Sequence, residues 1–366
     1  MQFSQISFTL LKNNRKTSKD FIMSIQQLIE RQEFIANGQG APLPLPKYDR
    51  YAICNLRGGI GKTSLAFNLS YLTDDLLVVD SCPQGNLSYF YNPNYIMQQD
   101  PSLNDMLLPY FLPGLGKGSH VAKPIGATNP YFQNKNNFFI KSSNELYMLP
   151  SQMANALVQA KTVTGHNRTT IIDNLLFSLD TEIRREQFET NTTRCLIDTS
   201  PFFSGATHLS WHATDALIVP VRTDVQSLNS LELVLSTLSN PASEFRKDMP
   251  SNNHTPKIQM IVLTHCGWST VAGAKNKPNQ QTLMFLQHAY DIVNRHIGAF
   301  TTQNPSNHIV MLDDFLGCGR ISSALSKPIN LMNAGETLSI NRVRTTVNSS
   351  VSKIQNELKF ISNSIW

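Results

Sequence analysis

The sequence predicts an α/β fold, with a mostly parallel, twisted β-sheet, helices on both faces and a short helical extension at the N-terminus. Short and almost continuous apolar runs, such as LLVVD at 76–80 and IQMIVL at 258–263, are typical of strands buried on both faces. Longer stretches with helical spacing separate these runs, which indicates βαβ units with right-handed crossovers. The apolar content of 41% is sufficient for a large core around such a sheet.

The N-terminal region precedes the sheet. Residues 20–37 carry apolar side chains at three- and four-residue spacing, which predicts a helix. Glycines and alternating prolines then predict a linker up to residue 48. Residues 1–22 show no clear hydrophobic period and are expected to form a loose arm. Because Met23 follows this arm, both Met1 and Met23 are candidates for the true start of the protein. We therefore divide the chain into an extension, 1–48, and one large domain, 49–366.

The elements of the large domain follow in chain order. The predicted strands are Tyr51–Leu56, Leu76–Asp80, Leu146–Leu149, Arg194–Asp198, Ala216–Val221 and Ile258–Leu263, with a weaker one at His308–Leu312. Residues 92–145, rich in Asn, Pro, Gly and Tyr, are interpreted as a long insertion, and residues 266–282 as a mobile loop. Apolar residues at helical spacing predict one helix over 337–362.

Composition excludes several classes of protein. Charged residues make up only 16% of the chain, which excludes a disordered polyelectrolyte and a coiled coil. The net charge of +5 permits contact with a polyanion without demanding it. Five single cysteines, with no C-x-x-C pair, argue against a disulfide framework and a zinc site. No apolar run reaches the ~18 residues of a membrane span, and the N-terminal order is the reverse of a secretory signal. We expect a reduced, cytoplasmic protein.

The most informative segment runs from Tyr51 to Ser64 and reads YAICNLRGGIGKTS. A strand leads into a glycine-rich turn and then a helix, so that backbone N–H groups and the helix N-terminus can surround phosphate oxygens. Lys62 would reach the outer phosphates, and the hydroxyl of Thr63 would bind Mg²⁺. This predicts a P-loop NTPase-like fold. The predicted cofactor-binding residues are Gly58, Gly59, Ile60, Gly61, Lys62, Thr63 and Ser64.

The turn departs from the general phosphate-loop pattern, because Leu56 stands where a glycine is expected and Arg57 precedes two glycines. This arrangement resembles the deviant Walker A box of the ParA/MinD family, K-G-G-x-G-K-[ST]. In that family the first lysine crosses a dimer interface to touch the partner's nucleotide, and the resemblance assigns Arg57 to its position. A solvated loop cation is the alternative for Arg57.

Two further segments carry the resemblance. LLVVDSCPQGNLS at 76–88 is similar to the family's strand-end box D-x-D-P-Q-G-N, with Asp80 in place and Cys82 where the second Asp stands. In the family that second carboxylate orients the attacking water, and a thiol is a poor substitute. Cys82 is either a low-pKa thiolate or a small apolar filler. RCLIDTSP at 194–201 resembles the Walker B strand and implies that Asp198 holds Mg²⁺. The resemblance spans about residues 50–335.

The resemblance implies an ATP- and Mg²⁺-binding protein that forms an ATP-dependent homodimer. Its ATPase activity is expected to be weak or partner-dependent, because Cys82 lacks a carboxylate and Asp80 and Asp198 are the nearest substitutes. The catalytic candidates are Arg57, Lys62, Cys82 and Asp80, and the metal candidates are Thr63 and Asp198. The alternative is a nucleotide-gated scaffold or switch of the MinD kind, which works by binding ATP rather than by turnover.

The family's DNA-partition members bind DNA non-specifically and respond to a ParB-like adaptor, which implies plasmid or chromosome segregation at the nucleoid. The candidate DNA-binding residues are Arg320, Lys327, Arg342 and Arg344, with Lys353 and Lys359 on the last predicted helix. A solvated helix face is the alternative. A membrane role is not favoured, since residues 352–366 contain only two cations and are more typical of a core helix. The N-terminal region is too short for a helix-turn-helix domain.

Overall fold

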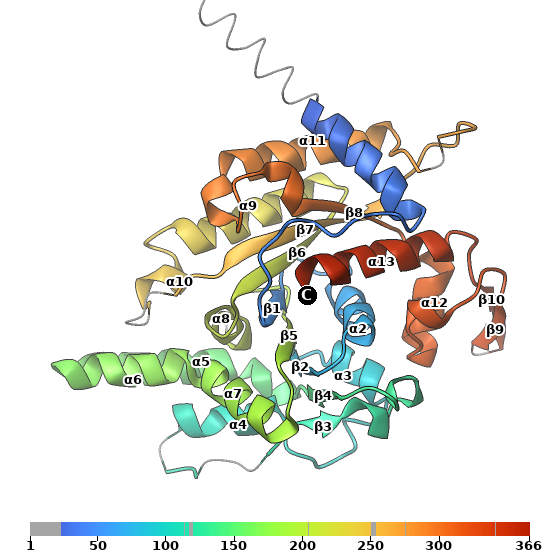
Figure 1. The fold of residues 1–366 in the computed structure, drawn as a ribbon. Helices are drawn as coiled ribbons and strands as arrows, with labels where there is room; N and C mark the ends of the chain where they lie inside the picture. The colour runs from blue at the N-terminus through green and yellow to red at the C-terminus, as the bar shows by residue number, and fades with distance from the viewer. Residues whose placement is uncertain are drawn as a thin grey trace, which may run out of the picture.

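The structure is a computed structural model that describes residues 23–112, 114–116, 120–203, 205–249, 254–274, 276–340 and 342–366. Within these residues an eight-stranded sheet forms the centre, in the order β3-β4-β2-β5-β1-β6-β7-β8 (Figure 1). The strands are β1 Arg50–Ile53, β2 Leu76–Asp80, β3 Lys123–Pro124, β4 Asn137–Ile140, β5 Arg194–Asp198, β6 Ala216–Arg222, β7 Lys257–Cys266 and β8 Ile309–Asp313. Every neighbouring pair is parallel except β3 and β4, which confirms the predicted fold class.

Helices cover both faces of the sheet (Figure 1). The helices of the first face are α4 Leu103–Phe111, α5 Leu149–Thr162, α6 His166–Leu176, α7 Ser178–Thr190, α8 Ala206–His212, α9 Val225–Ser239, α10 Glu244–Lys247 and α11 Gln280–Arg295. Those of the second face are α2 Lys62–Leu72, α3 Asn86–Tyr91, α12 Leu316–Leu325 and α13 Val351–Ile365. Strand alternation divides β1 between the faces, with Ala52 in the first core and Tyr51 and Ile53 in the second.

The strand order places β1 at the centre of the sheet, between β5 and β6. The chain leaves β1 for β2 and β5 on one side and reaches β6, β7 and β8 on the other. The carboxyl end of β1 therefore lies where the strand order reverses, and open α/β sheets bind ligands at such a point.

One predicted strand is wrong. Leu146–Leu149 lies in a 3₁₀ turn, η3 Asn144–Tyr147, and at the start of α5. The side chain of Ser143 accepts a hydrogen bond from the N–H of Glu145, and Pro150 stands in the first turn of α5. Both features favour a helix start over a strand. The strand is instead β4, NFFI, inside the segment interpreted as an insertion, and it pairs parallel with β2.

The single helix predicted over 337–362 is also wrong in its first half. A two-stranded hairpin, β9 Thr337–Ile340 and β10 Val343–Thr346, precedes α13. Arg342 has a left-handed φ of 69° at the turn, which an uninterrupted helix does not permit. The β-branched residues of TLSI and VRTT favour the paired strands. Two smaller differences concern strand bounds. β1 ends at Ile53 rather than at the predicted Leu56, and β7 spans Lys257–Cys266 rather than the predicted Ile258–Leu263.

The N-terminal helix, residues 23–36 in the described part, lies beside the edge strand β8 (Figure 1). Ile25, Leu28 and Ile35 are buried, and the guanidinium of Arg31 donates to the carbonyl oxygens of Ser306, at 2.7 Å, and Ile309. The helix thus covers an edge that would otherwise be open to another strand. The predicted arm and residues 20–22 of the predicted helix lie outside the described residues.

The C-terminal helix α13 packs as the core helix that its sequence predicts. Ile354, Leu358 and Ile361 are completely buried in the second core. Its Glu357 accepts a hydrogen bond of 2.5 Å from the side chain of Gln32, which joins the two ends of the described chain. Within the described part of the protein, every helix falls short of the length and apolar character needed to cross a membrane.

Helix α8 brings two histidines into an aromatic cluster. The centroid of the His208 ring lies 4.9 Å from that of Phe203 and 5.0 Å from that of His212. The ring of His212 stacks on Phe245, with the two centroids 4.6 Å apart. Burial lowers the pKa of His208 to about 4 and holds the pKa of His212 well below its ordinary value. Both rings are therefore neutral at pH 7, and protonating either one opposes folding.

The cluster predicts a loss of stability in mild acid. The unfolded chain protonates these histidines near pH 6.5 and folded His208 only near pH 4, so stability present above pH 6.5 is lost as the pH falls toward 4. Between pH 7.5 and pH 5, His208→Phe should lose about 2 kcal/mol less unfolding free energy than the wild type, as measured by urea denaturation. The control His288→Gln, at an exposed position of α11, should retain the wild-type dependence. An equal loss in wild type and His208→Phe would contradict this account.

Candidate functional site

The glycine-rich turn after β1 has the backbone conformation that a phosphate-binding loop requires. Gly59 and Gly61 have left-handed φ angles of 69° and 91°, and a Cβ added at either glycine would meet nothing within 4 Å. The space above them is therefore open to a ligand. Helix α2 begins directly at Lys62, and Gly61 supplies no side-chain cap, so that the first N–H groups of the helix can bind an anion.

Lys62 lies across the turn. Its Nζ donates to the carbonyl oxygens of Asn55, at 3.1 Å, and Arg57, at 2.7 Å, and the residue is 7% exposed. Burial lowers the pKa of Lys62, and the nearby charge of Asp198 opposes this shift. The ammonium group is thus held at the turn, where incoming phosphate oxygens could replace the carbonyl oxygens as its partners.

Two buried carboxyl groups end neighbouring strands beside this lysine. Asp80 of β2 and Asp198 of β5 are direct cross-strand partners, and each is 1% exposed. Burial raises the pKa of Asp80 to about 6, and burial together with the charge of Asp80 raises the pKa of Asp198 to about 7. Thr63 and Lys62 oppose the shift of Asp198. The two groups therefore share a nearly dry position that disfavours two negative charges side by side.

Asp198 and Thr63 have the chemistry of a magnesium site. The hydroxyl of Thr63 donates to Oδ2 of Asp198 at 2.7 Å, while Oδ1 is buried with no hydrogen-bond partner among the described residues. No group of three or more His, Cys, Asp or Glu side chains in the described ranges is arranged to hold a metal by itself. The residues present therefore fit Mg²⁺ that is held partly by nucleotide phosphates, which is the usual way in which Mg²⁺ binds.

Asp80 organises the turn that follows β2. Its Oδ1 accepts from the N–H of Cys82 at 3.2 Å, and its Oδ2 accepts from the N–H and the hydroxyl of Ser88, both at 2.8 Å. Gly85 in the same turn has a φ of 65°, and a Cβ there would lie 1.8 Å from the hydroxyl oxygen of Tyr95. Both oxygens of Asp80 thus have partners within the protein, and Asp80 is poorly placed to activate water.

Cys82 lies in this turn and is 5% exposed. Burial, with the charge of Asp80, raises the pKa of its thiol to about 11. The raised pKa favours the neutral thiol at pH 7, and so it favours the small apolar filler over the low-pKa thiolate. A neutral thiol is a poor hydrogen-bond acceptor and a poor general base.

Arg57 is docked on the neighbouring helix. Its Nη1 forms an ion pair with Asp224 and donates to the hydroxyl of Ser227 at 2.7 Å. Asp224 is also the N-cap of α9 and accepts from the N–H of Ser227. Arg57 is therefore not the freely solvated cation considered above. It is held beside the phosphate loop by a partly exposed contact.

A cavity of about 730 Å³ extends from the phosphate loop to the carboxyl ends of β7 and β8. Gly59, Gly61 and Ser64 line one part of it. The lining residues beyond the loop include Thr264, His265, Asp313, Asp314, Phe315, Leu316 and Arg320. His265 and Asp314 were not predicted as site residues. Their position at or just after a strand end was the only available signal.

The predicted DNA-binding residues are not gathered in one place. Arg320 lines the nucleotide-sized cavity, and Lys327 forms an ion pair of 3.0 Å with Glu336. Arg342 and Arg344 are exposed on the β9–β10 hairpin. The two additional candidates on α13 also differ. Lys353 is mostly buried, 3.6 Å from Asp313 and over the ring of Trp268, whereas Lys359 is exposed.

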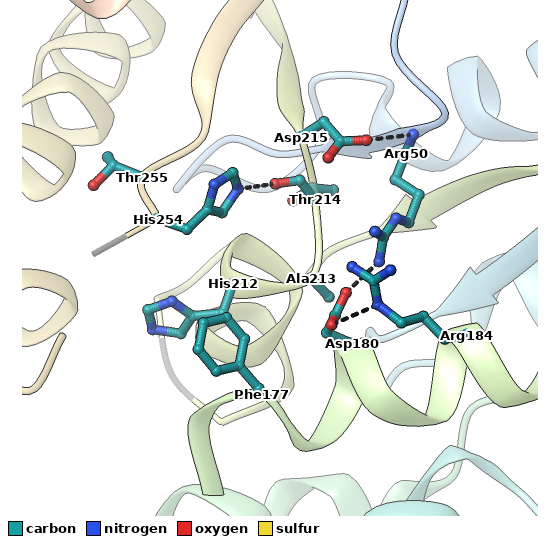
Figure 2. Close-up of a pocket in the computed structure, with 10 residues that line it drawn as sticks. All are labelled: Arg50, Phe177, Asp180, Arg184, His212, Ala213, Thr214, Asp215, His254 and Thr255. Carbon is teal, nitrogen blue, oxygen red and sulfur yellow. Dashed lines mark hydrogen bonds and ion pairs between the residues drawn. The ribbon is translucent and has the colours of Figure 1, made fainter. Parts of the chain in front are cut away.

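A second cavity, of about 700 Å³, lies at the opposite, amino-terminal edge of the sheet (Figure 2). Figure 2 shows the side chains of Arg50 and Arg184 converging on Asp180, while Asp215 accepts from the backbone N–H of Arg50. Its opposite charges are thus paired with one another. The carboxyl edge, in contrast, has an open glycine turn and a carboxylate oxygen that finds no partner among the described residues, and it is the stronger candidate for a functional site.

Comparisons with known proteins identify a family and a relative. The family model AAA_31, described as an AAA domain, matches residues 49–250. An uncharacterized protein of Methanocaldococcus jannaschii is 25% identical over 218 residues, covering 57% of this chain and 70% of that protein.

Two solved structures are among those that match this chain. A plasmid partition protein of Borrelia burgdorferi bound to AMPPNP has a TM-score of 0.52 at 12% identity, covering 86% of this chain and 98% of that chain. A single-residue variant of McdA from Cyanothece, in complex with ATP, has a TM-score of 0.47 at 17% identity, covering 76% of this chain and 86% of that chain. The likeness to the Borrelia protein shows the common fold. Since the family model spans more than half of the 366 residues, the chain belongs to this AAA-domain family of ParA/MinD-type P-loop proteins.

Proposed function

We propose that this protein binds ATP with Mg²⁺ at the carboxyl edge of its sheet and forms an ATP-dependent homodimer that acts in DNA partition. In this proposal residues 49–366 form the nucleotide-binding domain and residues 1–48 its extension. The observation that supports this proposal is the open glycine turn, with the Nζ of Lys62 donating to the carbonyl oxygen of Arg57 and the hydroxyl of Thr63 donating to the buried Asp198. The Borrelia protein of the same fold holds AMPPNP, an ATP analogue.

Each residue of the site has a role in this proposal. The N–H groups of residues 58–64 surround the phosphates, and Lys62 neutralises their charge. Thr63 and Asp198 hold Mg²⁺, which would neutralise further phosphate charge. Arg57 leaves Asp224 to contact a phosphate of the partner's nucleotide, as a guanidinium can do with two parallel hydrogen bonds. Asp224 then remains as the N-cap of α9.

Hydrolysis is expected to be slow. An attacking water needs a group that accepts its proton or orients it, and Cys82 supplies only a neutral, buried thiol. Asp80 is occupied by Cys82 and Ser88, and Asp198 is assigned to the metal. The neutral thiol of Cys82 also favours the second candidate function, a nucleotide-gated switch. Such a switch acts through the binding of ATP and does not depend on its hydrolysis.

The DNA contact is proposed for Arg342 and Arg344, because both are exposed on one hairpin. Arginines there would contact phosphates and carry no base specificity. A ParB-like adaptor would act on the ATP-bound dimer, and DNA binding would place the protein at the nucleoid.

The first prediction from the proposed function separates nucleotide binding from dimerisation. Lys62→Ala should weaken ATP–Mg²⁺ binding by about 10- to 100-fold in calorimetric titrations, because it removes a charge-assisted contact to phosphate. Arg57→Ala should bind ATP nearly as well as the wild type, yet fail to dimerise with ATP in sedimentation velocity. Arg57→Lys should restore part of the dimer. Unchanged dimerisation of Arg57→Ala would refute the proposed contact between protomers.

The second prediction concerns turnover. Cys82→Asp should raise the ATPase rate by about tenfold or more, since a positioned general base contributes ~10²–10⁴-fold to a rate. Cys82→Ser, which is similar in size and carries no carboxylate, should stay at the wild-type rate. Phosphate release is measured with and without DNA. Equal rates for Cys82→Asp and Cys82→Ser would show that position 82 does not limit turnover.

The third prediction concerns DNA. In the presence of ATP, the double variant Arg342→Ala/Arg344→Ala should bind duplex DNA more weakly than the wild type. A plot of the logarithm of its binding constant against the logarithm of the salt concentration should be less steep by about two units per chain, one for each lost phosphate contact. Arg295→Gln is the matched control, because Arg295 is exposed on α11 and pairs with Glu232. Fluorescence anisotropy at several salt concentrations gives both quantities. An unchanged slope in the double variant would exclude the hairpin as the DNA contact.

A further inference from the structure

The N-terminal helix, residues 23–36, has a polar side chain that is buried against α13. Gln32 is 1% exposed, and Glu357 of α13 is completely buried. The Nε2 of Gln32 donates to Oε1 of Glu357 at 2.5 Å, although the two residues are 325 positions apart in the chain. Burying polar side chains is costly unless hydrogen bonds satisfy them. This contact therefore favours one position of the N-terminal helix relative to α13.

Glu357 also binds the end of β8. Its Oε2 accepts a hydrogen bond of 2.8 Å from the N–H of Asp313, the last residue of that strand. The Nζ of Lys353 lies 4.0 Å from Oε1 of Glu357 and 3.6 Å from Oδ2 of Asp313. Both oxygens of Glu357 thus have partners, and a lysine lies between the two carboxyl groups. A buried side chain that is held from two sides in this way links the N-terminal helix to β8.

Asp313 begins a segment, residues 313–316, that lines the cavity at the carboxyl edge. Oδ1 of Asp313 accepts from the N–H of Asp314 at 2.8 Å, and Oδ1 of Asp314 accepts from the N–H of Leu316 at 3.1 Å. Leu316 has a left-handed φ of 43°, which residues other than glycine adopt rarely and which persists where the surroundings hold it. A continuous series of hydrogen bonds therefore runs from the N-terminal helix to the wall of the cavity.

We propose that Gln32 and Glu357 are positioning residues for the nucleotide. They hold residues 313–316 in the conformation that binds it, so that docking of the N-terminal helix and binding of ATP stabilise each other. Neither side chain belongs to the described lining of the cavity, and both act through Asp313. The proposal rests on the proposed function, because it requires a nucleotide in this cavity. Coupling of this kind is reciprocal, so it can be measured from either end.

Other contacts anchor the N-terminal helix without touching residues 313–316. Arg31 binds two carbonyl oxygens beside the start of β8. The side chain of Asn356, on α13, donates to the carbonyl oxygen of Ala36 at 3.0 Å. The helix can therefore stay docked when the contact between Gln32 and Glu357 is lost. Asn356 offers a matched control, because it joins the same two helices.

The first part of the test measures the affinity for ATP with Mg²⁺ by calorimetry on the full chain. Gln32→Met removes the hydrogen bond to Glu357 and should weaken ATP binding by about fivefold or more, the lower end of ordinary coupling between sites. The exchanged pair Gln32→Glu/Glu357→Gln should keep an affinity close to that of the wild type. In that pair the amide at position 357 can still accept from Asp313 and donate to the carboxylate at position 32. Asn356→Ala should also keep the wild-type affinity.

The second part measures amide hydrogen exchange in the wild type. ATP with Mg²⁺ should slow exchange in residues 23–36 by about fivefold or more, because bound nucleotide favours the docked helix. Helix α6, which contributes no residue to the lining of the cavity, should exchange equally with and without ATP. In Gln32→Met the effect of ATP on residues 23–36 should disappear. A purely structural role of Gln32 would loosen the helix to the same extent with and without ATP.

The results separate this proposal from the proposed function. The positioning role is overturned if Gln32→Met binds ATP as tightly as the wild type, or if ATP leaves exchange in residues 23–36 unchanged. It is also overturned if the exchanged pair or Asn356→Ala loses as much affinity as Gln32→Met. In all of these cases the wild type still binds ATP, and the proposed function stands. If Gln32→Met does not fold, exchange in the wild type decides alone. Failure of the wild type to bind any nucleotide would overturn the proposed function itself.

Discussion

Asp80 and Asp198 stand side by side at the ends of β2 and β5, and almost no solvent reaches either carboxyl group. Two like charges in such a place are costly unless other groups compensate them. The hydroxyl and N–H of Ser88 and the N–H of Cys82 bind Asp80, while Thr63 binds Asp198. Lys62 adds a positive charge nearby. The turns after β1 and β2 are shaped around this pair, and one oxygen of Asp198 is left for a ligand.

The charged side chains at the two edges of the sheet differ in how fully they are paired within the protein. At the amino edge, Arg50 and Arg184 are paired with Asp180, so the charged groups of that cavity satisfy one another (Figure 2). At the carboxyl edge, carbonyl oxygens hold Lys62, and within the described part of the chain one oxygen of Asp198 has no hydrogen-bond partner. A site whose charges lack full partners can gain them from a charged ligand. This difference, together with the central position of β1, favours the carboxyl edge as the candidate functional site.

The sequence predicted what depends on local pattern. The glycine turn, the buried strands such as β2 and β5, and the core helix α13 all follow from short segments, because glycine spacing and apolar runs act locally. The strand β4 was missed, because four residues within a segment rich in Asn and Pro carry too little periodicity. Contacts between distant segments could not be predicted either. Arg57 and Asp224 are 167 positions apart, and only the folded sheet shows that Arg320 lines the cavity.

The central claim is that this carboxyl edge binds ATP and retains it. The most direct measurement mixes the wild-type protein with stoichiometric ATP and Mg²⁺, separates bound from free nucleotide, and identifies the bound species after successive quench times. The account predicts about one nucleotide per chain that remains ATP for many minutes, because Cys82 supplies no base. An absence of bound nucleotide, or its complete conversion to ADP within seconds, would contradict it.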